Sequence, residues 1–339
     1  MAQENLLERP RHAGDAAPVH EDVLRLPEPW VLHHGDVLDR PRMAYRVEGP
    51  PGAPLVAVLG GMSAHRVLAG AGGWWPQIVG PGLGIDTERH RVLGVDYLGG
   101  RGDSATPDGT APFPPISAFD QAAALAAIVR RLGADPLHAI VGASYGGMVA
   151  LAFAANHPEL VGRIVMVSAA HKAQVLSTAW RSVQRQIVRE ALARGAGAEG
   201  LKLARALAMA TYRTAAEFSQ RFGGAPRRDG GRFRFPVEDY LFARGDDYVR
   251  RYRAESFLAL SESIDLHAVD PASVTVPATL VAVREDQLVP IGDVRELAAR
   301  LGPRAELIEI DSLYGHDAFL KESAALGPII RRTLAERPS

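Results

Sequence analysis

The 339-residue sequence contains no cysteine. That absence excludes disulfides, thiolate metal sites and a cysteine nucleophile, and it leaves the redox compartment undefined. A surplus of either charge is also lacking, because 38 Lys and Arg residues balance 39 Asp and Glu residues. A chain so close to neutral has no general attraction for polyanions, so the composition gives no reason to expect nucleic acid as a partner.

Long uncharged apolar runs are lacking as well. No stretch approaches the roughly 18 residues that a membrane-spanning helix needs, and the first twenty residues are polar and mixed in charge. They lack the apolar region of a signal peptide, so we expect a cytoplasmic protein that acts away from membranes. With 47% hydrophobic and 23% charged residues, the composition is typical of a globular enzyme.

Strand-like and helical patterns alternate along the chain. The expected strands lie at residues 43–47, 55–59, 91–95, 137–141, 163–167, 278–283 and 305–310. Apolar residues at helical spacing predict helices at 117–132 and 145–156. Strands that alternate with helices favour a mostly parallel central sheet covered by helices on both faces.

Residues 142–146 read Gly-Ala-Ser-Tyr-Gly and directly follow an expected strand. This Gly-x-Ser-x-Gly pattern is typical of the strand-to-helix turn on which an α/β hydrolase presents its nucleophilic serine, here Ser144. Glycine on either side permits a turn too tight for larger side chains. The pentapeptide alone also fits a plain small-residue turn, so the interpretation depends on partners for the serine.

A serine hydroxyl needs an imidazole base, and the base needs an orienting carboxylate. In α/β hydrolases these residues occur in the order serine, acid, histidine. Asp286 follows the strand expected at 278–283, and His316 follows the strand expected at 305–310. We predict a triad of Ser144, His316 and Asp286, with Glu285 as a rival acid that the sequence leaves open.

Catalysis on a serine also needs an oxyanion hole made of two backbone N–H groups. One is expected from Tyr145, the residue after the nucleophile. The other is expected from the glycine-rich segment that ends the strand at 55–59, where Gly60 and Gly61 are both candidates. The glycine-rich segment would also fit a simple turn that ends the strand and has no catalytic role.

The strand pattern disappears between His171 and Leu266 and is replaced by helical patterns. Helices are expected there at residues 178–192, 201–211, 215–222 and 236–243. We interpret residues 172–265 as a helical lid inserted into an α/β-hydrolase core, which residues 30–171 and 266–339 form. Residues 1–29 are expected to be an N-terminal arm.

Several further segments resemble the homoserine O-acyltransferase family of α/β-hydrolase-fold enzymes. The similar segments, between Leu59 and Glu322, are 73–75, 78–82, 98–100, 142–148, 210–213, 217–218 with 221–222, 237–241 and 315–320. The resemblance implies a ping-pong transfer of an acyl group from an acyl-coenzyme A to the hydroxyl of L-homoserine, in methionine biosynthesis. It also implies a homodimer that meets through its lids.

Carried over from the family, the substrate-binding arginine falls on Arg185 and the amine-binding acid on Asp317. This division suits an amino acid, because a guanidinium binds a carboxylate and a carboxylate binds an ammonium group. Arg181 lies one helical turn before Arg185 and would suit a donor that carries its own carboxylate. Members that use succinyl-CoA resemble this chain at Trp180-Arg181 and in residues 60–63, so we hypothesise an L-homoserine O-succinyltransferase with succinyl-CoA as co-substrate.

Three alternatives remain at this stage. The same triad could serve an esterase or thioesterase, although the lid arginines and Asp317 speak against it. A silent binding protein on this fold would be expected to lack a triad residue. Acetyl-CoA as donor, or serine as acceptor, would be closer variants. No metal or bound cofactor is expected, because the histidines lack a metal-binding spacing such as His-Glu-x-x-His; these are His65, His138, His171 and His267.

Overall fold

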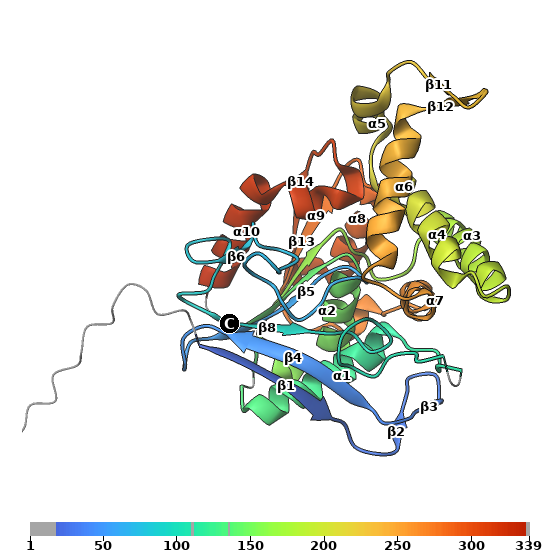
Figure 1. The fold of residues 1–339 in the computed structure, drawn as a ribbon. Coiled ribbons are helices and arrows are strands. Elements are labelled where there is room, and N and C mark those ends of the chain that lie inside the picture. Colours follow the sequence, from blue (N-terminus) through green and yellow to red (C-terminus); the bar gives the residue numbers. More distant parts are fainter. Residues whose placement is uncertain (1–17, 110–111, 135, 337–339) are drawn as a thin grey trace, which may run out of the picture.

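The computed structural model describes residues 18–109, 112–134 and 136–336, and it contains an eight-stranded sheet (Figure 1). In spatial order the strands are β1 (Val19–Arg25), β4 (Arg42–Glu48), β8 (Arg91–Val95), β5 (Leu55–Leu59), β9 (Ala139–Ala143), β10 (Ile164–Val167), β13 (Ala278–Val283) and β14 (Ala305–Ile310). β4 pairs antiparallel with β1 and β8, and every other neighbouring pair is parallel. The mostly parallel sheet predicted from the sequence is confirmed.

Both faces of the sheet are buried, which explains why its central strands read as unbroken apolar runs. In β5, Leu55, Ala57 and Leu59 join one apolar cluster, whereas Val56 and Val58 join a second cluster on the opposite face. Among the helices outside residues 172–265, α1 (Ala118–Leu132), α2 (Tyr145–Asn156) and α8 (Ile291–Leu301) contribute to the first cluster, whereas α10 (Ser323–Ala335) and Phe319 contribute to the second.

The expectation of an N-terminal arm at 1–29 is wrong for its second half. Val19–Arg25 forms the edge strand β1 and pairs with all seven residues of β4. Six of its seven side chains are exposed, so backbone pairing rather than an apolar face holds the strand in place. That explains why no strand pattern was visible, and residues 1–17 lie outside the described residues. The shorter elements of the core are β2 (Trp30–Val31), β3 (Val37–Leu38), β6 (Val79–Gly80), β7 (Ile85–Asp86) and α9 (Ala318–Lys321).

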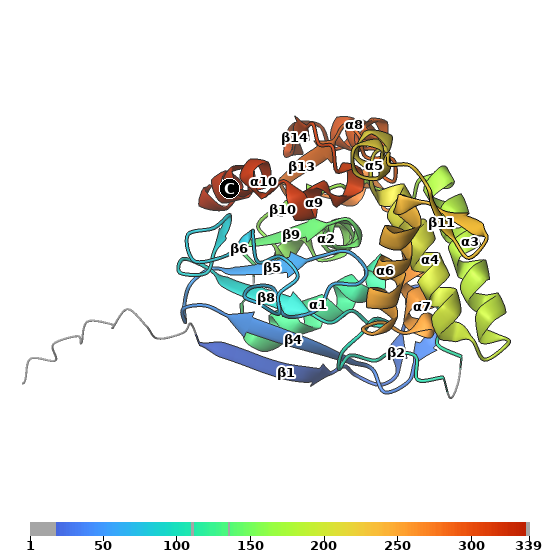
Figure 2. The same cartoon turned by 45° about the horizontal axis from the view of Figure 1, so that its top comes forward.

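Between β10 and β13 the chain forms a group of helices that lies beside the sheet, on the right in Figure 1 and in the turned view of Figure 2. These elements are α3 (Val175–Leu192), α4 (Gly197–Tyr212), α5 (Ala215–Phe222), a hairpin of β11 (Arg227–Asp229) and β12 (Arg232–Arg234), α6 (Pro236–Val249) and α7 (Ala254–Asp265). We refer to residues 172–265 as the lid. No helix in the described part of the chain combines the length and apolar character that crossing a bilayer requires.

Several lid elements differ from the sequence-based prediction, and one is the hairpin of β11 and β12, in a region where only helices were expected. α6 continues to Val249 instead of ending at 243, and α7 was not predicted. Gly245 lies inside α6, and a side chain there would overlap the backbone oxygen of Lys202 in α4. The glycine therefore permits close packing of α6 against α4 and does not end the helix.

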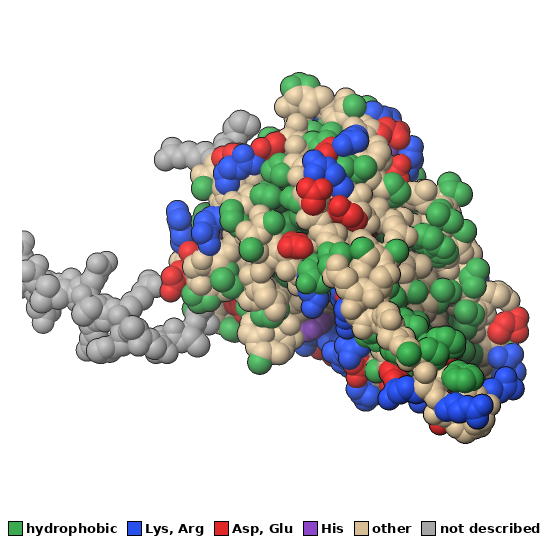
Figure 3. All heavy atoms as spheres, turned by 90° about the horizontal axis from the view of Figure 1, so that it is seen from above, with side chains coloured by type: hydrophobic (Ala, Val, Ile, Leu, Met, Phe, Trp, Pro, Cys, Tyr) green, Lys and Arg blue, Asp and Glu red, His purple; other side chains and the backbone are tan. Residues whose placement is uncertain are grey.

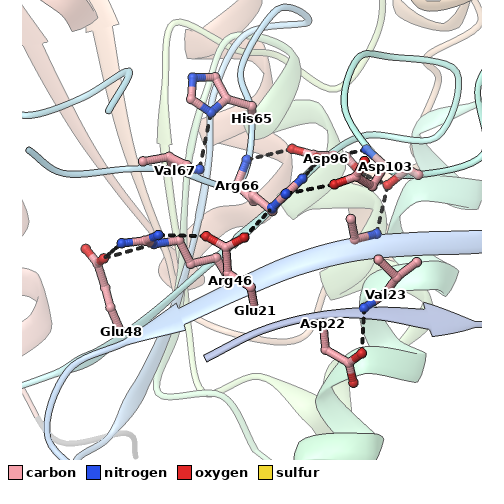
Figure 4. Close-up of polar contacts among 12 residues, drawn as sticks. Glu21, Asp22, Val23, Arg46, Glu48, His65, Arg66, Val67, Asp96 and Asp103 are labelled. Atoms are coloured by element: carbon pink, nitrogen blue, oxygen red, sulfur yellow. Dashed lines mark hydrogen bonds and ion pairs between the residues drawn. The ribbon is translucent and has the colours of Figure 1, made fainter. Parts of the chain in front are cut away.

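A network of charged side chains holds the segment that follows β5 (Figure 4). The carboxylate of Asp96, at the end of β8, accepts hydrogen bonds from the backbone N–H of Arg66 at 2.9 Å and pairs with its guanidinium. Arg66 also contacts Glu21 of β1 at 3.2 Å, and Glu21 pairs with Arg46 of β4 at 2.7 Å. Three strands are thereby tied to residues 60–66, which continue from the end of β5 toward the site described next.

Candidate active site

Ser144 lies on a tight turn between β9 and α2. Its backbone has φ 53° and ψ −120°, in the left-handed half of conformational space that costs energy for a residue with a side chain. A side chain at Gly142 would overlap the backbone of Gly146, and one at Gly146 would overlap the backbone oxygen of Leu59. The two glycines of the pentapeptide thus permit the close approach that holds Ser144 at the carboxyl end of the sheet.

The three residues predicted to form a triad are in contact. Oγ of Ser144 lies 2.8 Å from Nε2 of His316, and Nδ1 of His316 lies 2.7 Å from Oδ2 of Asp286. The other oxygen of Asp286 accepts hydrogen bonds from the backbone N–H groups of Leu288 and Val289, at 2.9 and 3.0 Å. These bonds fix the orientation of the carboxylate.

The rival acid takes another position. Oε2 of Glu285 accepts a hydrogen bond from the backbone N–H of Ser312 at 2.8 Å, so it holds the loop that carries His316 and not the imidazole itself. Burial by itself would lower the pKa of His316, but the charge and hydrogen bond of Asp286 outweigh burial and raise the pKa above its usual value. A neutral His316 would donate from Nδ1 to Asp286 and accept at Nε2 from Ser144.

Two of the three residues predicted for the oxyanion hole, Tyr145 and Gly61, line a cavity beside Ser144. Tyr145 is the first residue of α2, so its backbone N–H has no acceptor within the helix. Gly61 lines the cavity beside Ser144, and Gly60 precedes it, with its carbonyl oxygen accepting a 2.8 Å hydrogen bond from the hydroxyl of Tyr97. A side chain at Gly60 would overlap the ring of Trp74. The small residue is therefore needed for packing at this point.

A cavity of about 240 Å³ adjoins Ser144 and His316, between the core and the lid. Apolar side chains form much of its wall, including Met62, Trp74, Met148, Trp180, Phe257, Leu288 and Phe319. Its charged lining residues are Lys172, Arg181, Arg205, Asp293 and Asp317. An apolar pocket with a few charged groups beside a nucleophile is the usual form of a small-molecule site.

Two arginines of α3 share one carboxylate. Arg181 lines the cavity and lies 2.6 Å from Oδ1 of Asp265, whereas Arg185 pairs with Oδ2 of Asp265 and donates to the carbonyl oxygen of Ser261 at 3.0 Å. Arg185 is buried behind the wall and is not among the lining residues. The structure therefore brings Arg181 and Asp317 to the cavity but keeps Arg185 away from it.

Arg205 of α4 is a lining residue that the sequence analysis missed. Its guanidinium lies 5.2 Å from the ring centre of Tyr212 and 4.7 Å from that of Tyr248. Within the described residues no carboxylate lies within ion-pair distance of it, so its charge is available to the cavity. The available signal was an arginine on the apolar side of a helix, among Leu201, Ala204 and Ala208, which are all buried.

The histidines considered as metal ligands have other surroundings. Nε2 of His138 lies 2.8 Å from the carbonyl oxygen of Leu334, and Nε2 of His267 lies 3.0 Å from that of Ala170. Burial lowers the pKa of His267 to about 4. Across residues 18–109, 112–134 and 136–336, no three potential metal-ligating side chains come together.

The fold and the serine turn define the α/β-hydrolase class, and residues 54–323 match the alpha/beta hydrolase fold family. A homoserine O-succinyltransferase of Xanthomonas campestris pv. campestris is 44% identical over 298 residues, which cover 86% of this chain and 79% of that protein. A homoserine O-acetyltransferase of Clavibacter michiganensis subsp. michiganensis is 34% identical, covering 89% of this chain and 90% of that protein.

A solved structure of homoserine O-acetyltransferase from Bacillus anthracis superposes with a TM-score of 0.85 at 18% identity, covering 95% of this chain and 99% of that one. At that identity the likeness concerns the fold. Taken with the two sequence relatives, it leads to one conclusion: the chain belongs to the homoserine O-acyltransferase family of the α/β-hydrolase fold.

Proposed function

We propose that this protein is an L-homoserine O-succinyltransferase that transfers the succinyl group of succinyl-CoA through an ester on Ser144. The observation that carries the proposal is a match of charges. Two guanidinium groups, of Arg181 and Arg205, and the carboxylate of Asp317 line the cavity beside Ser144. The acyl group and the acceptor together bring two carboxylates and one ammonium group, which is the complementary set.

In the first half-reaction Oγ of Ser144 attacks the thioester carbonyl carbon of succinyl-CoA, and its proton passes to Nε2 of His316. The oxyanion of the tetrahedral intermediate accepts hydrogen bonds from the N–H of Tyr145 and from that of Gly60 or Gly61. The carbon–sulfur bond then breaks, and His316 returns the proton to the coenzyme A thiolate. The result is a succinyl ester on Ser144 and free coenzyme A.

In the second half-reaction the homoserine hydroxyl occupies the place that the thiol has left. His316 accepts its proton, the oxygen attacks the ester carbonyl, and the bond to Oγ of Ser144 breaks as the serine regains a proton. The products are O-succinyl-homoserine and the free enzyme. Water would compete for the ester, so the lid over the cavity has the task of excluding it.

Three of the charged groups in the cavity, those of Arg181, Arg205 and Asp317, receive a role in this scheme. Arg205, which has no carboxylate partner among the described residues, binds the carboxylate of homoserine, and Asp317 binds its ammonium group. Arg181 binds the carboxylate of the succinyl group. Arg181 and Arg185 share Asp265, so one positive charge of the three-residue cluster remains uncompensated. An acetyl donor would leave that charge without a partner.

The proposal is tested by supplying each of acetyl-CoA and succinyl-CoA with each of homoserine and serine, and identifying the products by mass spectrometry. O-succinyl-homoserine should dominate, and Ser144→Ala should abolish its formation. Serine differs from homoserine by one methylene group, a discrimination of only about 1–3 kcal/mol in a pocket. Release of coenzyme A at full rate without any acceptor would instead indicate a thioesterase.

We further propose that the enzyme is a cytoplasmic homodimer whose subunits meet through their lids. Exposed apolar side chains gather on the lid, which lies on the right in Figure 3. They are Val175, Leu176, Val183, Leu203, Phe233, Phe235 and Phe242. An exposed apolar group of this size supports an interface between copies. Light scattering during size exclusion should give twice the chain mass, and Leu203→Glu should reduce it to the monomer.

A further inference from the structure

Two tyrosines near the end of α6 reach from the lid to residues 60–63, which follow β5 and include both candidate glycines of the oxyanion hole. The hydroxyl of Tyr252 donates to the carbonyl oxygen of Met62 at 3.0 Å. The hydroxyl of Tyr248 lies 2.8 Å from Oγ of Ser63. Both tyrosines are at most 8% exposed, and their rings stack with centres 5.0 Å apart. The lid is thus joined directly to the segment beside Ser144.

The carbonyl oxygens of the first three residues in this segment are all engaged. Besides that of Met62, the carbonyl oxygen of Gly60 accepts a hydrogen bond from the hydroxyl of Tyr97, and that of Gly61 accepts one from the N–H of Ala64, both at 2.8 Å. In a planar trans peptide the N–H points away from the carbonyl oxygen, so each bond also fixes the direction of the following N–H. An oxyanion hole must present N–H groups to the developing negative charge. Glycines restrain their own backbone little, so bonds from other residues must supply the restraint.

The lid also contacts the other half of the oxyanion hole. The hydroxyl of Tyr145, whose backbone N–H is the first expected donor, lies 2.6 Å from Oγ of Ser263 in α7. Both residues are at most 1% exposed. α7 is bound in turn to the loop after β8, because Oγ of Ser256 donates to the carbonyl oxygen of Gly100 at 2.7 Å. The position of the lid and the geometry of the oxyanion hole are therefore linked.

The tyrosine hydroxyls remain donors near neutral pH. Burial raises the pKa of Tyr97 and of Tyr252 well above the usual value, and it raises the pKa of Tyr248 to about 12. A protonated phenol can donate to a carbonyl oxygen, whereas a phenolate cannot. Titration of these groups therefore does not release the segment from the lid near neutral pH.

We propose that Tyr248 and Tyr252 are positioning residues for the oxyanion hole, through which the lid holds the peptide planes of residues 60–63 in the orientation that catalysis needs. Neither tyrosine lines the cavity, so both act through the backbone that they hold. The inference rests on the proposed acyl transfer through Ser144, but not on the identity of the acyl group or the acceptor. One oxyanion hole serves both half-reactions, so both should depend on these tyrosines to the same degree.

The test removes one hydroxyl from the full-length enzyme and keeps the buried ring. Tyr252→Phe should lower the rates of both half-reactions by about threefold to thirtyfold, less than the loss of about a hundredfold or more for removing an oxyanion donor outright. KM for succinyl-CoA and for homoserine should stay within about twofold of the parent, because the lost bond is not made to either substrate. Coenzyme A release in the first turnover and formation of the product measure the two rates.

Tyr45→Phe is the matched control. Tyr45 is 2% exposed, and its hydroxyl bonds to Asp22 of the edge strand β1 at 3.4 Å. The substitution therefore removes the same atom from another buried tyrosine, in a part of the sheet that does not line the cavity. It should leave both half-reactions unchanged.

A pair of inhibitors distinguishes positioning from a general loss of structure. A trifluoromethyl ketone that carries the succinyl chain resembles the tetrahedral intermediate once Oγ of Ser144 bonds to its carbonyl carbon. The proton of Ser144 passes to His316, and the ketone oxygen becomes an oxyanion. The corresponding methyl ketone has a similar shape but forms this adduct far less readily. In Tyr252→Phe the inhibition constant of the trifluoromethyl ketone should rise by the factor by which the rates fall, whereas that of the methyl ketone should not change.

A second pair of variants tests the bond of Tyr248 from both sides and covers the case in which Tyr252→Phe does not fold. Tyr248→Phe and Ser63→Ala should each slow both half-reactions by about twofold to tenfold, the range for one neutral hydrogen bond. The double variant should be no slower than either single variant, because all three lack the same bond. The ring of Tyr248, 4.7 Å from the guanidinium of Arg205, is retained, so KM for homoserine should not change.

Several results would overturn the role of the two tyrosines. They are unchanged rates in Tyr252→Phe, an equal loss in Tyr45→Phe, an equal rise of the inhibition constants of both ketones, or additive effects of Tyr248→Phe and Ser63→Ala. Failure of the proposed function would look different, because the parent enzyme itself would then form no succinyl ester on Ser144 or would not pass it to homoserine.

Discussion

The carboxylate of Asp286 and the imidazole of His316 form a buried pair, with Oδ2 of the first 2.7 Å from Nδ1 of the second. Asp286 raises the pKa of His316 against the opposing effect of burial. A base that must be neutral to accept a proton therefore titrates above its ordinary value of 6.5. The acid limb of the pH profile for acylation of Ser144 should consequently lie above that value.

Asp286→Asn removes the main group that raises the pKa of His316, so the pKa should fall because burial is then opposed only by the charge of Asp317. The acid limb should move to lower pH, while kcat falls by about a hundredfold or more because the imidazole loses its orienting partner. Coenzyme A release in the first turnover, followed across pH, measures both effects. Glu285→Gln is the control and should leave the limb in place. A limb that stays unchanged in Asp286→Asn would contradict the assignment.

Replacing Arg205 should weaken recognition of the acceptor. Arg205→Gln removes the charge proposed to bind the carboxylate of homoserine, so KM for homoserine should rise by about tenfold to a hundredfold while acylation by succinyl-CoA persists. The variant should discriminate less than the parent between homoserine and homoserine amide. Arg189→Gln, at an exposed position on α3, provides the control. Equal effects of the two substitutions would argue against a specific role for Arg205.

Replacing Arg181 should change the choice of donor. Arg181→Gln removes the guanidinium proposed to bind the succinyl carboxylate, so kcat/KM for succinyl-CoA should fall by about tenfold or more relative to that for acetyl-CoA. Arg181→Lys keeps the charge and should retain part of the preference. Competition between the two donors in one reaction gives the ratio directly. If parent and variant use succinyl-CoA and acetyl-CoA in the same ratio, Arg181 does not select the donor.

The network around Asp96 predicts a loss of stability. Asp96 is 1% exposed, and it bonds to the backbone and side chain of Arg66 and to the backbone N–H of Asp103 at 3.2 Å. Asp96→Ala should lower the free energy of unfolding by about 2–3 kcal/mol, less than for a fully buried pair because Arg66 keeps some contact with water. Urea unfolding measures the change. The exposed Asp39 pairs only with Arg40 among described residues, so Asp39→Ala should cost less than about 0.5 kcal/mol.

Acid should destabilise the folded protein, and His267 should contribute to the pH range in which this happens. Burial lowers its pKa from 6.5 to about 4, so the unfolded chain binds a proton there before the folded one does. This contribution to stability is complete above pH 6.5 and is lost as the pH falls toward 4. His267→Gln should flatten the decline in melting temperature over that window. His20→Gln, at an exposed position, should follow the parent curve.

The sequence predicted the parts of this fold in which a local pattern coincides with burial. Both β5 and β13 begin and end where expected, because each is a fully buried, largely apolar run. The edge strand β1 was missed, since pairing with β4 depends on backbone hydrogen bonds and leaves most of its side chains exposed. α7 was missed because it forms by packing against α3 and α4. Those contacts join distant parts of the chain and leave no pattern in the local sequence.

The site shows the same division. The fold places the serine, the acid and the histidine after successive strands, in a fixed order along the chain. The three contacting residues could therefore be named from the sequence alone. The choice between Asp286 and Glu285, or between Arg185 and Arg205, depends on the rotation of a strand end or of a helix. Arg185 and Arg205 both belong to lid helices but lie on differently oriented helix faces. Arg185 therefore pairs with Asp265, whereas Arg205 lines the cavity.

His316 and Asp317 are consecutive residues on a single short turn, Gly315–Asp317. A rearrangement that re-aims the second side chain must therefore also displace the first. Arg181, in contrast, projects from a separate helix whose adjustment need not disturb that turn. With the roles proposed for Arg181 and Asp317, a change of acyl chain should therefore need substitutions in α3 alone, whereas a change to acceptors other than α-amino acids should also disturb His316.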